Sequence, residues 1–106
     1  MPTFPQFPDY DDTLTIPNGW VDISWHNNAC PSIAKEVNKK LSVVIWCDYK
    51  APEKRRDGEG NFQDSTRFYV SIENDGHELT PYANFYVFEH ALVHANSLAN
   101  SLSKGE

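Results

Sequence analysis

Residues 80–103 read TPYANFYVFEHALVHANSLANSLS, and their apolar side chains recur at alternating steps of three and four. The recurring positions are Phe85, Phe88, Leu92, Ala95, Ala99 and Leu102. This spacing is typical of a helix with one apolar face. Thr80 can cap such a helix, and Pro81 suits its first turn, where a backbone N–H has no partner. We predict a C-terminal helix over 80–103, about 22 residues and about 33 Å long.

The apolar face of this helix predicts how it packs. Burial of its four larger side chains would contribute roughly 6–12 kcal/mol before opposing terms are counted. Because that gross term is comparable to the net stability of a small domain, we expect the helix to be indispensable. We therefore predict that Leu92→Asp, which places a charge on this face, prevents folding.

Upstream of the helix, apolar residues alternate with polar ones, as in β-strands. Val21, Ile23 and Trp25 share one face of 19–26, which predicts a half-buried strand. Residues 33–40 fit either a short helix capped by Ser32 or a strand over 33–37, and we favour the strand. Residues 41–49 are apolar on both faces, which predicts a central strand. Residues 67–73 form a further predicted strand.

A tight hairpin is predicted at Asn74-Asp75-Gly76, because Asp-Gly suits a type I′ turn. The chain would return as a short strand over 77–79 and enter the helix. These elements predict an α+β domain, with an antiparallel sheet of about four or five strands and one long C-terminal helix packed across it.

The N-terminal 18 residues differ from the rest in containing four prolines, which favour extended backbone. Phe4 and Phe7 are three residues apart and would face the same side of such a segment. We divide the chain into an extended arm, 1–18, and a single domain, 19–106. We expect the arm to dock on its own domain through these rings; the alternative is exchange with a second copy or insertion into a partner.

The net charge of −6 is unevenly distributed along the chain. Residues 35–56 hold seven of the nine Lys and Arg residues, and acids dominate on both sides. An acidic balance disfavours direct nucleic-acid binding and favours a basic protein or ribonucleoprotein partner. The basic loop with Lys50, Lys54, Arg55 and Arg56 could contact phosphates, but we favour a solvated loop because no aromatic residue is interleaved with it.

We expect a cytoplasmic protein. The N-terminus has neither the basic nor the apolar region of a signal peptide, and no apolar run is long enough to span a membrane. Cys30 and Cys47 are then expected to be free thiols.

Six residues invite a metal site, but their predicted placement argues against one. They are His26, Cys30, Cys47, His77, His90 and His94. His90 and His94 have ligand spacing on a helix, yet the predicted seam places them away from the core, while Cys47 points inward. We predict neither a metal nor a cofactor. We also expect no enzymatic activity; the alternative is a thiol-dependent enzyme using Cys30 with His26.

The predicted outer face of the helix carries Tyr86, His90, Val93 and His94 where Lys and Glu are usual. Aromatic and apolar side chains on a surface suit a protein interface. We therefore predict that these four residues bind a partner, and that Asp9, Asp11 and Asp12 steer its approach.

Three motifs resemble a known group of proteins. They lie in 17–32, PNGWVDISWHNNACPS, and in 46–52, WCDYKAP, followed by Arg67-Phe68. The pattern Gly-Trp-x-Asp-x-Ser-Trp, then Cys-Pro-Ser, then Trp-x-Asp-Tyr resembles small uncharacterised proteins of bacterial phages and mobile elements. The resemblance covers about the middle half of the chain. It implies a role in phage–host conflict, where small acidic domains act as inhibitors such as anti-CRISPR proteins.

Together these observations predict a non-enzymatic binding protein, most simply an inhibitor that blocks a surface of a larger macromolecular partner. A homo-oligomeric structural domain, for example a homodimer, is the remaining alternative.

Overall fold

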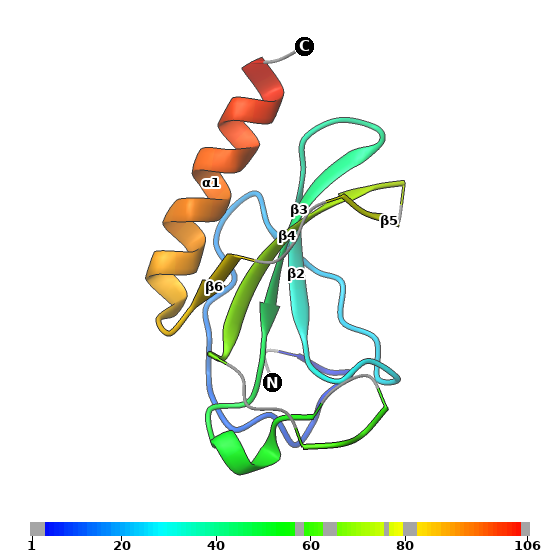
Figure 1. Cartoon of the computed structure of the whole chain (residues 1–106), viewed down its shortest axis with the longest axis vertical. Helices are drawn as coiled ribbons and strands as arrows, with labels where there is room; N and C mark the ends of the chain where they lie inside the picture. Colours follow the sequence, from blue (N-terminus) through cyan, green and yellow to red (C-terminus); the bar gives the residue numbers. More distant parts are fainter. Residues whose placement is uncertain (1–3, 57–58, 63–65, 76, 80–82, 105–106) are drawn as a thin grey trace.

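The computed structural model describes residues 4–56, 59–62, 66–75, 77–79 and 83–104. These residues form one antiparallel sheet and one C-terminal helix packed against it (Figure 1). The chain therefore has the α+β architecture predicted from its periodicity. No helix in the described ranges has the length and apolar character needed to cross a membrane.

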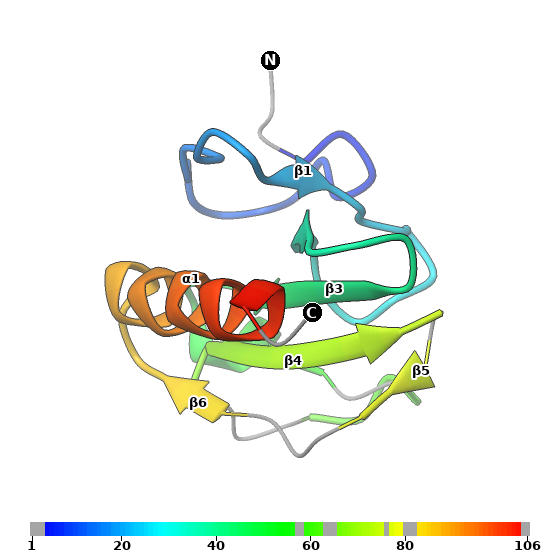
Figure 2. The same cartoon turned by 90° about the horizontal axis from the view of Figure 1, so that it is seen from above.

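Within the described residues, six strands make up the sheet, and most neighbours along the chain are also neighbours in space. The strands are β1 (Val21–Asp22), β2 (Ser32–Glu36), β3 (Leu41–Cys47), β4 (Phe68–Asn74), β5 (His77–Glu78) and β6 (Ala83–Phe85). The order runs from β1 to β5, and β6 pairs with the first half of β4 while β5 pairs with its end. Figure 2 shows β1 at one edge, β5 and β6 at the other, and the helix against one face.

The helix α1 (Phe88–Lys104) is shorter than predicted, with 17 residues and a length of about 26 Å. The predicted start was wrong, because Ala83–Phe85 is a strand; Thr80 and Pro81 lie outside the described residues. Aromatic and β-branched residues before Phe88 suit a strand, and β4 offers an edge with which they pair. The carbonyl of Val87 accepts the first helical hydrogen bond, from Ala91 N at 3.2 Å.

The buried face of α1 agrees only partly with the predicted stripe, because Ala91 was not in that stripe and Phe85, which was, lies in β6. Ala91 and Ala95 are fully buried, and Ala99 nearly so, against the sheet. Phe88, Leu92, Leu98 and Leu102 pack around them and are only partly buried. Small side chains therefore form the centre of the seam, and the larger ones lie along its margins.

The central position of β3 is confirmed, since it lies between β2 and β4 and is buried on both faces. Val43 and Ile45 belong to the core cluster beneath α1, and Val44, of opposite parity, is also fully buried. Residues 32–36 form β2, which confirms the predicted strand rather than the alternative, a short helix.

The predicted strand over 19–26 reduces to the two residues of β1, and its apolar face is the exposed one. Val21, Ile23 and Trp25 are exposed, whereas Trp20 is buried. Trp20 packs in the core, and its indole Nε1 donates to Asn96 Oδ1 on α1 at 3.3 Å. Side chains in this segment do alternate between two faces, but contact with α1 determines which of the two faces is buried.

Two further predictions hold. At the predicted hairpin, Asp75 has a positive φ of 53° and Asn74 pairs with His77 across β4 and β5, while Gly76 lies outside the described residues. Phe4 and Phe7 are buried in the same core cluster as α1, so the N-terminal segment docks on its own chain.

Candidate functional site

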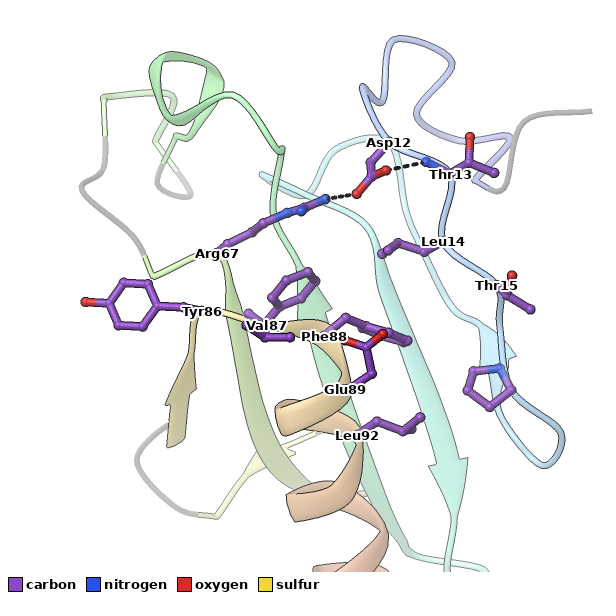
Figure 3. Close-up of a pocket in the computed structure, with 12 residues that line it drawn as sticks. Asp12, Thr13, Leu14, Thr15, Arg67, Tyr86, Val87, Phe88, Glu89 and Leu92 are labelled. Atoms are coloured by element: carbon purple, nitrogen blue, oxygen red, sulfur yellow. Dashed lines mark hydrogen bonds and ion pairs between the residues drawn. The ribbon is translucent and has the colours of Figure 1, made fainter.

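An open groove with a volume of about 630 Å³ lies between residues 12–17 and the first turn of α1 (Figure 3). Leu14, Val87, Phe88 and Leu92 give it an apolar floor. Polar side chains line the rim: Asp12, Thr13, Thr15 and Glu89. Segments from the two ends of the chain therefore build one concave surface.

Arg67 closes one end of this groove and is held by three partners. Its Nη2 donates to Asp12 Oδ2 at 2.7 Å and to the Tyr10 hydroxyl at 3.3 Å, and its Nε donates to the Asp48 carbonyl at 3.1 Å. The backbone of Arg67 has a positive φ of 89°, which costs a non-glycine residue on the order of 1–2 kcal/mol. These contacts hold the residue in that conformation.

The charges of Arg67 and Asp12 offset one another. Hydrogen bonding and proximity to the Arg67 guanidinium hold the pKa of Asp12 below its ordinary value of 3.8, against an opposing effect of burial. The pair is therefore ionised at neutral pH. Burial raises the pKa of Tyr10, so its hydroxyl stays protonated beside the pair.

Apart from Arg67, the described residues that line the groove come from parts of the chain without Lys or Arg. Residues 1–34 and 68–103 contain no Lys or Arg. Among the described residues that line the groove, Arg67 is the only basic one, and Asp12 offsets its charge. Because the charges of Arg67 and Asp12 offset one another, the charge of Glu89 makes the rim of the groove weakly acidic.

The four residues predicted as one helical face do not form one. Tyr86 precedes α1 and is 80% exposed at the lip of the groove, with its ring directed away from Leu14 and Leu92 (Figure 3). His90 and Val93 are exposed on α1. His94 is half-buried, with its ring 5.1 Å from that of Phe85. These residues do not share one helical face because α1 begins at Phe88, after Tyr86.

The three acids predicted to steer a partner hold the N-terminal segment in place. Asp11 accepts hydrogen bonds at 2.7 Å from the backbone N–H groups of Lys50 and Ala51, which outweigh burial and lower its pKa. Asp12 pairs with Arg67, and Asp9 accepts from the Tyr49 hydroxyl at 3.2 Å. The groove residues Leu14, Val87 and Arg67 were not identified from the sequence, because nothing in their spacing indicates that they meet.

Cys30 and His26 do not form the arrangement that a thiol enzyme needs. Cys30 is 1% exposed, and burial, followed by the nearby charge of Asp48, raises the pKa of its thiol to about 12. The imidazole of His26 instead lies 2.8 Å from Gln6 Oε1 through Nδ1. A buried, protonated thiol is a poor nucleophile.

In the described part of the chain, no group of three or more His, Cys, Asp or Glu residues could hold a metal ion. No family model, curated protein or solved structure matches this chain.

Proposed function

We propose that the protein is a binding domain that takes an apolar segment of a larger, basic protein partner into the groove beside α1. The observation that supports this is the open apolar floor at the start of α1, next to the fixed Arg67–Asp12 pair. Val87 is 41% exposed there, beside the far more exposed Tyr86. Binding would block whatever surface of the partner contains that segment, so the protein acts as an inhibitor.

The groove has the composition of a protein interface. Interfaces concentrate binding energy in a few aromatic and apolar contacts at the centre, surrounded by a polar rim. Phe88, Val87 and Leu14 supply the centre, and Thr13, Thr15 and Glu89 supply the rim. Tyr86 stands at the lip of the groove, next to Val87.

Charge selects the kind of partner. The protein carries a net charge of −6, and the groove adds an acidic rim to its apolar floor. A segment that combines apolar side chains with Lys or Arg therefore complements it. The overall charge would also speed the approach of a basic partner, an effect that falls as salt rises.

The resemblance to phage and mobile-element proteins supports an inhibitory setting. An anti-CRISPR-like inhibitor of a host ribonucleoprotein is the version of this proposal that agrees with both the resemblance and the charge. Its action would be steric blockade through protein contacts.

A peptide-display selection tests the proposal. We expect the protein to enrich peptides in which large apolar residues accompany Lys or Arg. We expect Val87→Asp to weaken binding of those peptides at least about tenfold, because a charge replaces an apolar contact in the floor. Val93→Asp introduces the same charge at an exposed site on α1 and should leave binding unchanged.

Two outcomes would contradict this proposal. If the enriched peptides were acidic, the argument from charge would be wrong. If Val87→Asp bound the peptides as tightly as the wild type, the groove would not be the binding site. Comparing peptide binding by Tyr86→Ala and by His94→Ala shows whether the lip of the groove or the face of α1 contributes to binding. Sedimentation at two protein concentrations shows whether a second copy of the chain occupies the groove instead.

A further inference from the structure

A second concave surface lies away from the groove, at the end of β3. It has a volume of about 470 Å³, within the range of about 300–1,000 Å³ common for small-ligand sites. Residues from four separated parts of the chain line it, including Gln6, His26, Asn28, Tyr49, Lys54 and Arg56. Its basic side chains are Lys54 and Arg56, whereas the basic side chain described in the groove, Arg67, is paired with Asp12.

The charge in this pocket is opposite to that of the whole molecule. Lys54 and Arg56 line it, and Asp9 is the only acid among the described lining residues. The Asp9 carboxylate accepts a hydrogen bond from the Tyr49 hydroxyl at 3.2 Å. Burial, followed by the charge of Asp9, raises the pKa of Tyr49, so that hydroxyl remains a donor. The pocket thus offers two cations, the ring of His26 and side-chain amides to an anion.

Arg56 is oriented before any ligand arrives. Its Nη1 donates to the carbonyl oxygens of Glu53 and Arg55 at 2.7 and 2.8 Å. These bonds use one nitrogen of the guanidinium, which has further N–H donors on Nε and Nη2. A preoriented guanidinium is well suited to bind a phosphate oxygen pair.

An aromatic ring lies beside each of Lys54, Arg56 and His26. The rings of Trp25 and His26 lie 4.4 Å apart, Lys54 Nζ lies 6.0 Å from the Tyr49 ring, and Arg56 Cζ lies 5.9 Å from the Phe62 ring. Trp25 and Phe62 are 52% and 63% exposed, so each presents a ring to solvent. Trp25 and Phe62 do not line the pocket themselves, but each lies beside a residue that does, His26 and Arg56 respectively.

From these contacts we propose that this pocket binds a nucleotide. Its phosphate lies between Lys54, Arg56 and His26, and its base stacks on one of the exposed rings, Trp25 or Phe62. Aromatic stacking and cations together are the chemistry by which proteins hold unpaired nucleotides. The net charge of −6 opposes a long strand more than a single nucleotide, which adds few charges close to the local cations. The ligand is therefore nucleotide-sized.

Titration with adenosine monophosphate, followed by tryptophan fluorescence and amide NMR shifts, tests this site. We expect saturable binding with shifts at His26, Tyr49 and Arg56. Arg56→Ala should weaken it about 10- to 100-fold, the range for one charge-assisted hydrogen bond. Trp25→Ala or Phe62→Ala should weaken it about tenfold through lost stacking. Lys39→Ala, which removes an exposed charge at the β2–β3 turn, should bind normally.

Two further ligands and a chain-length series decide what the pocket recognises. Adenosine and inorganic phosphate should each bind much more weakly than adenosine monophosphate; equal binding of either would overturn the proposal. Affinity that rises steadily with the length of a single-stranded oligonucleotide would overturn the nucleotide-sized site in favour of strand binding. Absence of saturation at millimolar concentration would reject the site outright. Val87→Asp should not affect this binding, so failure here and failure of the groove are distinguishable.

Discussion

At the scale of single residues, the Arg67–Asp12 pair links the N-terminal segment to the start of β4. The two residues are 55 positions apart, and their side chains are 13% and 26% exposed. Partial burial strengthens the attraction relative to a surface pair, and the contacts to Tyr10 and Asp48 satisfy further donors of the guanidinium. One strained residue therefore supports both the fold and the wall of the groove.

We expect Asp12→Asn to lower the free energy of unfolding by about 1–3 kcal/mol at neutral pH. Because Asp12 has a lowered pKa in the folded state, its ionised form stabilises the protein above its ordinary pKa of 3.8. That stabilisation is lost as the pH falls through the folded-state pKa. Urea unfolding at pH 7 and at about pH 2 should show the difference from wild type shrinking with acid.

Glu36→Gln removes an exposed carboxylate at the end of β2 and is the matched control. It should change stability little at either pH. A difference between wild type and Asp12→Asn that stays constant with pH would show that the ion pair is not its cause.

Cys30 should resist alkylation in the folded protein. Burial restricts access, and a thiol with its pKa raised to about 12 holds almost no thiolate near neutral pH. Mass spectrometry after iodoacetamide treatment at pH 7.5 should find modification only once denaturant is present. Rapid modification of the native protein would instead revive a role for Cys30 as a nucleophile.

At the scale of elements, α1 approaches the sheet closely because small residues form the centre of its seam. Ala91 and Ala95 are fully buried, whereas Leu92 is partly buried at the edge of the groove. The most sensitive position is therefore an alanine. The periodicity of the sequence indicated roughly where the seam lies. Judged by side-chain size alone, however, the most important residues would be the larger ones, which lie at the margins of the seam.

We expect Ala95→Asp to prevent folding, because it buries a carboxylate for which the seam offers no space or partner. Val93→Asp, two residues earlier and 71% exposed, should change stability by less than about 0.5 kcal/mol. Circular dichroism and urea unfolding distinguish these outcomes. We expect Leu92→Asp to be destabilising but less severe than Ala95→Asp. A cooperatively folded Ala95→Asp variant would contradict the assigned seam.

At the scale of the whole molecule, one core joins the N-terminal segment to the C-terminal helix. Phe4 packs edge-on against Tyr10, with ring centroids 5.1 Å apart, and Tyr10 contacts Tyr49 beyond β3. The hydrogen bonds of Asp11 to residues 50 and 51 fasten the same segment. The first residues of the described chain therefore contribute to the central core.

We expect Phe4→Ala to lower the free energy of unfolding by about 3–5 kcal/mol, since it empties a fully buried site. Pro5→Ala, at an exposed neighbouring position, should change it by less than about 1 kcal/mol. Urea unfolding followed by both fluorescence and circular dichroism measures the effect. If Phe4→Ala left stability unchanged, the segment would not belong to the cooperative unit.

The whole molecule also separates its charges. The acidic groove uses residues from the two ends of the chain, and the basic pocket uses the middle loop together with 6–9 and 26–29. From the sequence, the net charge disfavoured nucleic acid and the basic loop had no aromatic residue within it. In the fold, Trp25 lies beside His26 and Phe62 lies beside Arg56. His26 and Arg56 both line the pocket, which changes the chemistry available there.

The sequence by itself determined β3, β4 and the hairpin after β4, favoured a strand at β2, and located part of the seam of α1. Each of these depends on periodicity or turn chemistry within a few neighbouring residues, where the physical preference is local. The tertiary structure decided where α1 begins, which face of 20–25 is buried and which side chains share a surface. Those outcomes depend on contacts between distant residues, such as Trp20 with Asn96 and Asp12 with Arg67, which no local pattern encodes.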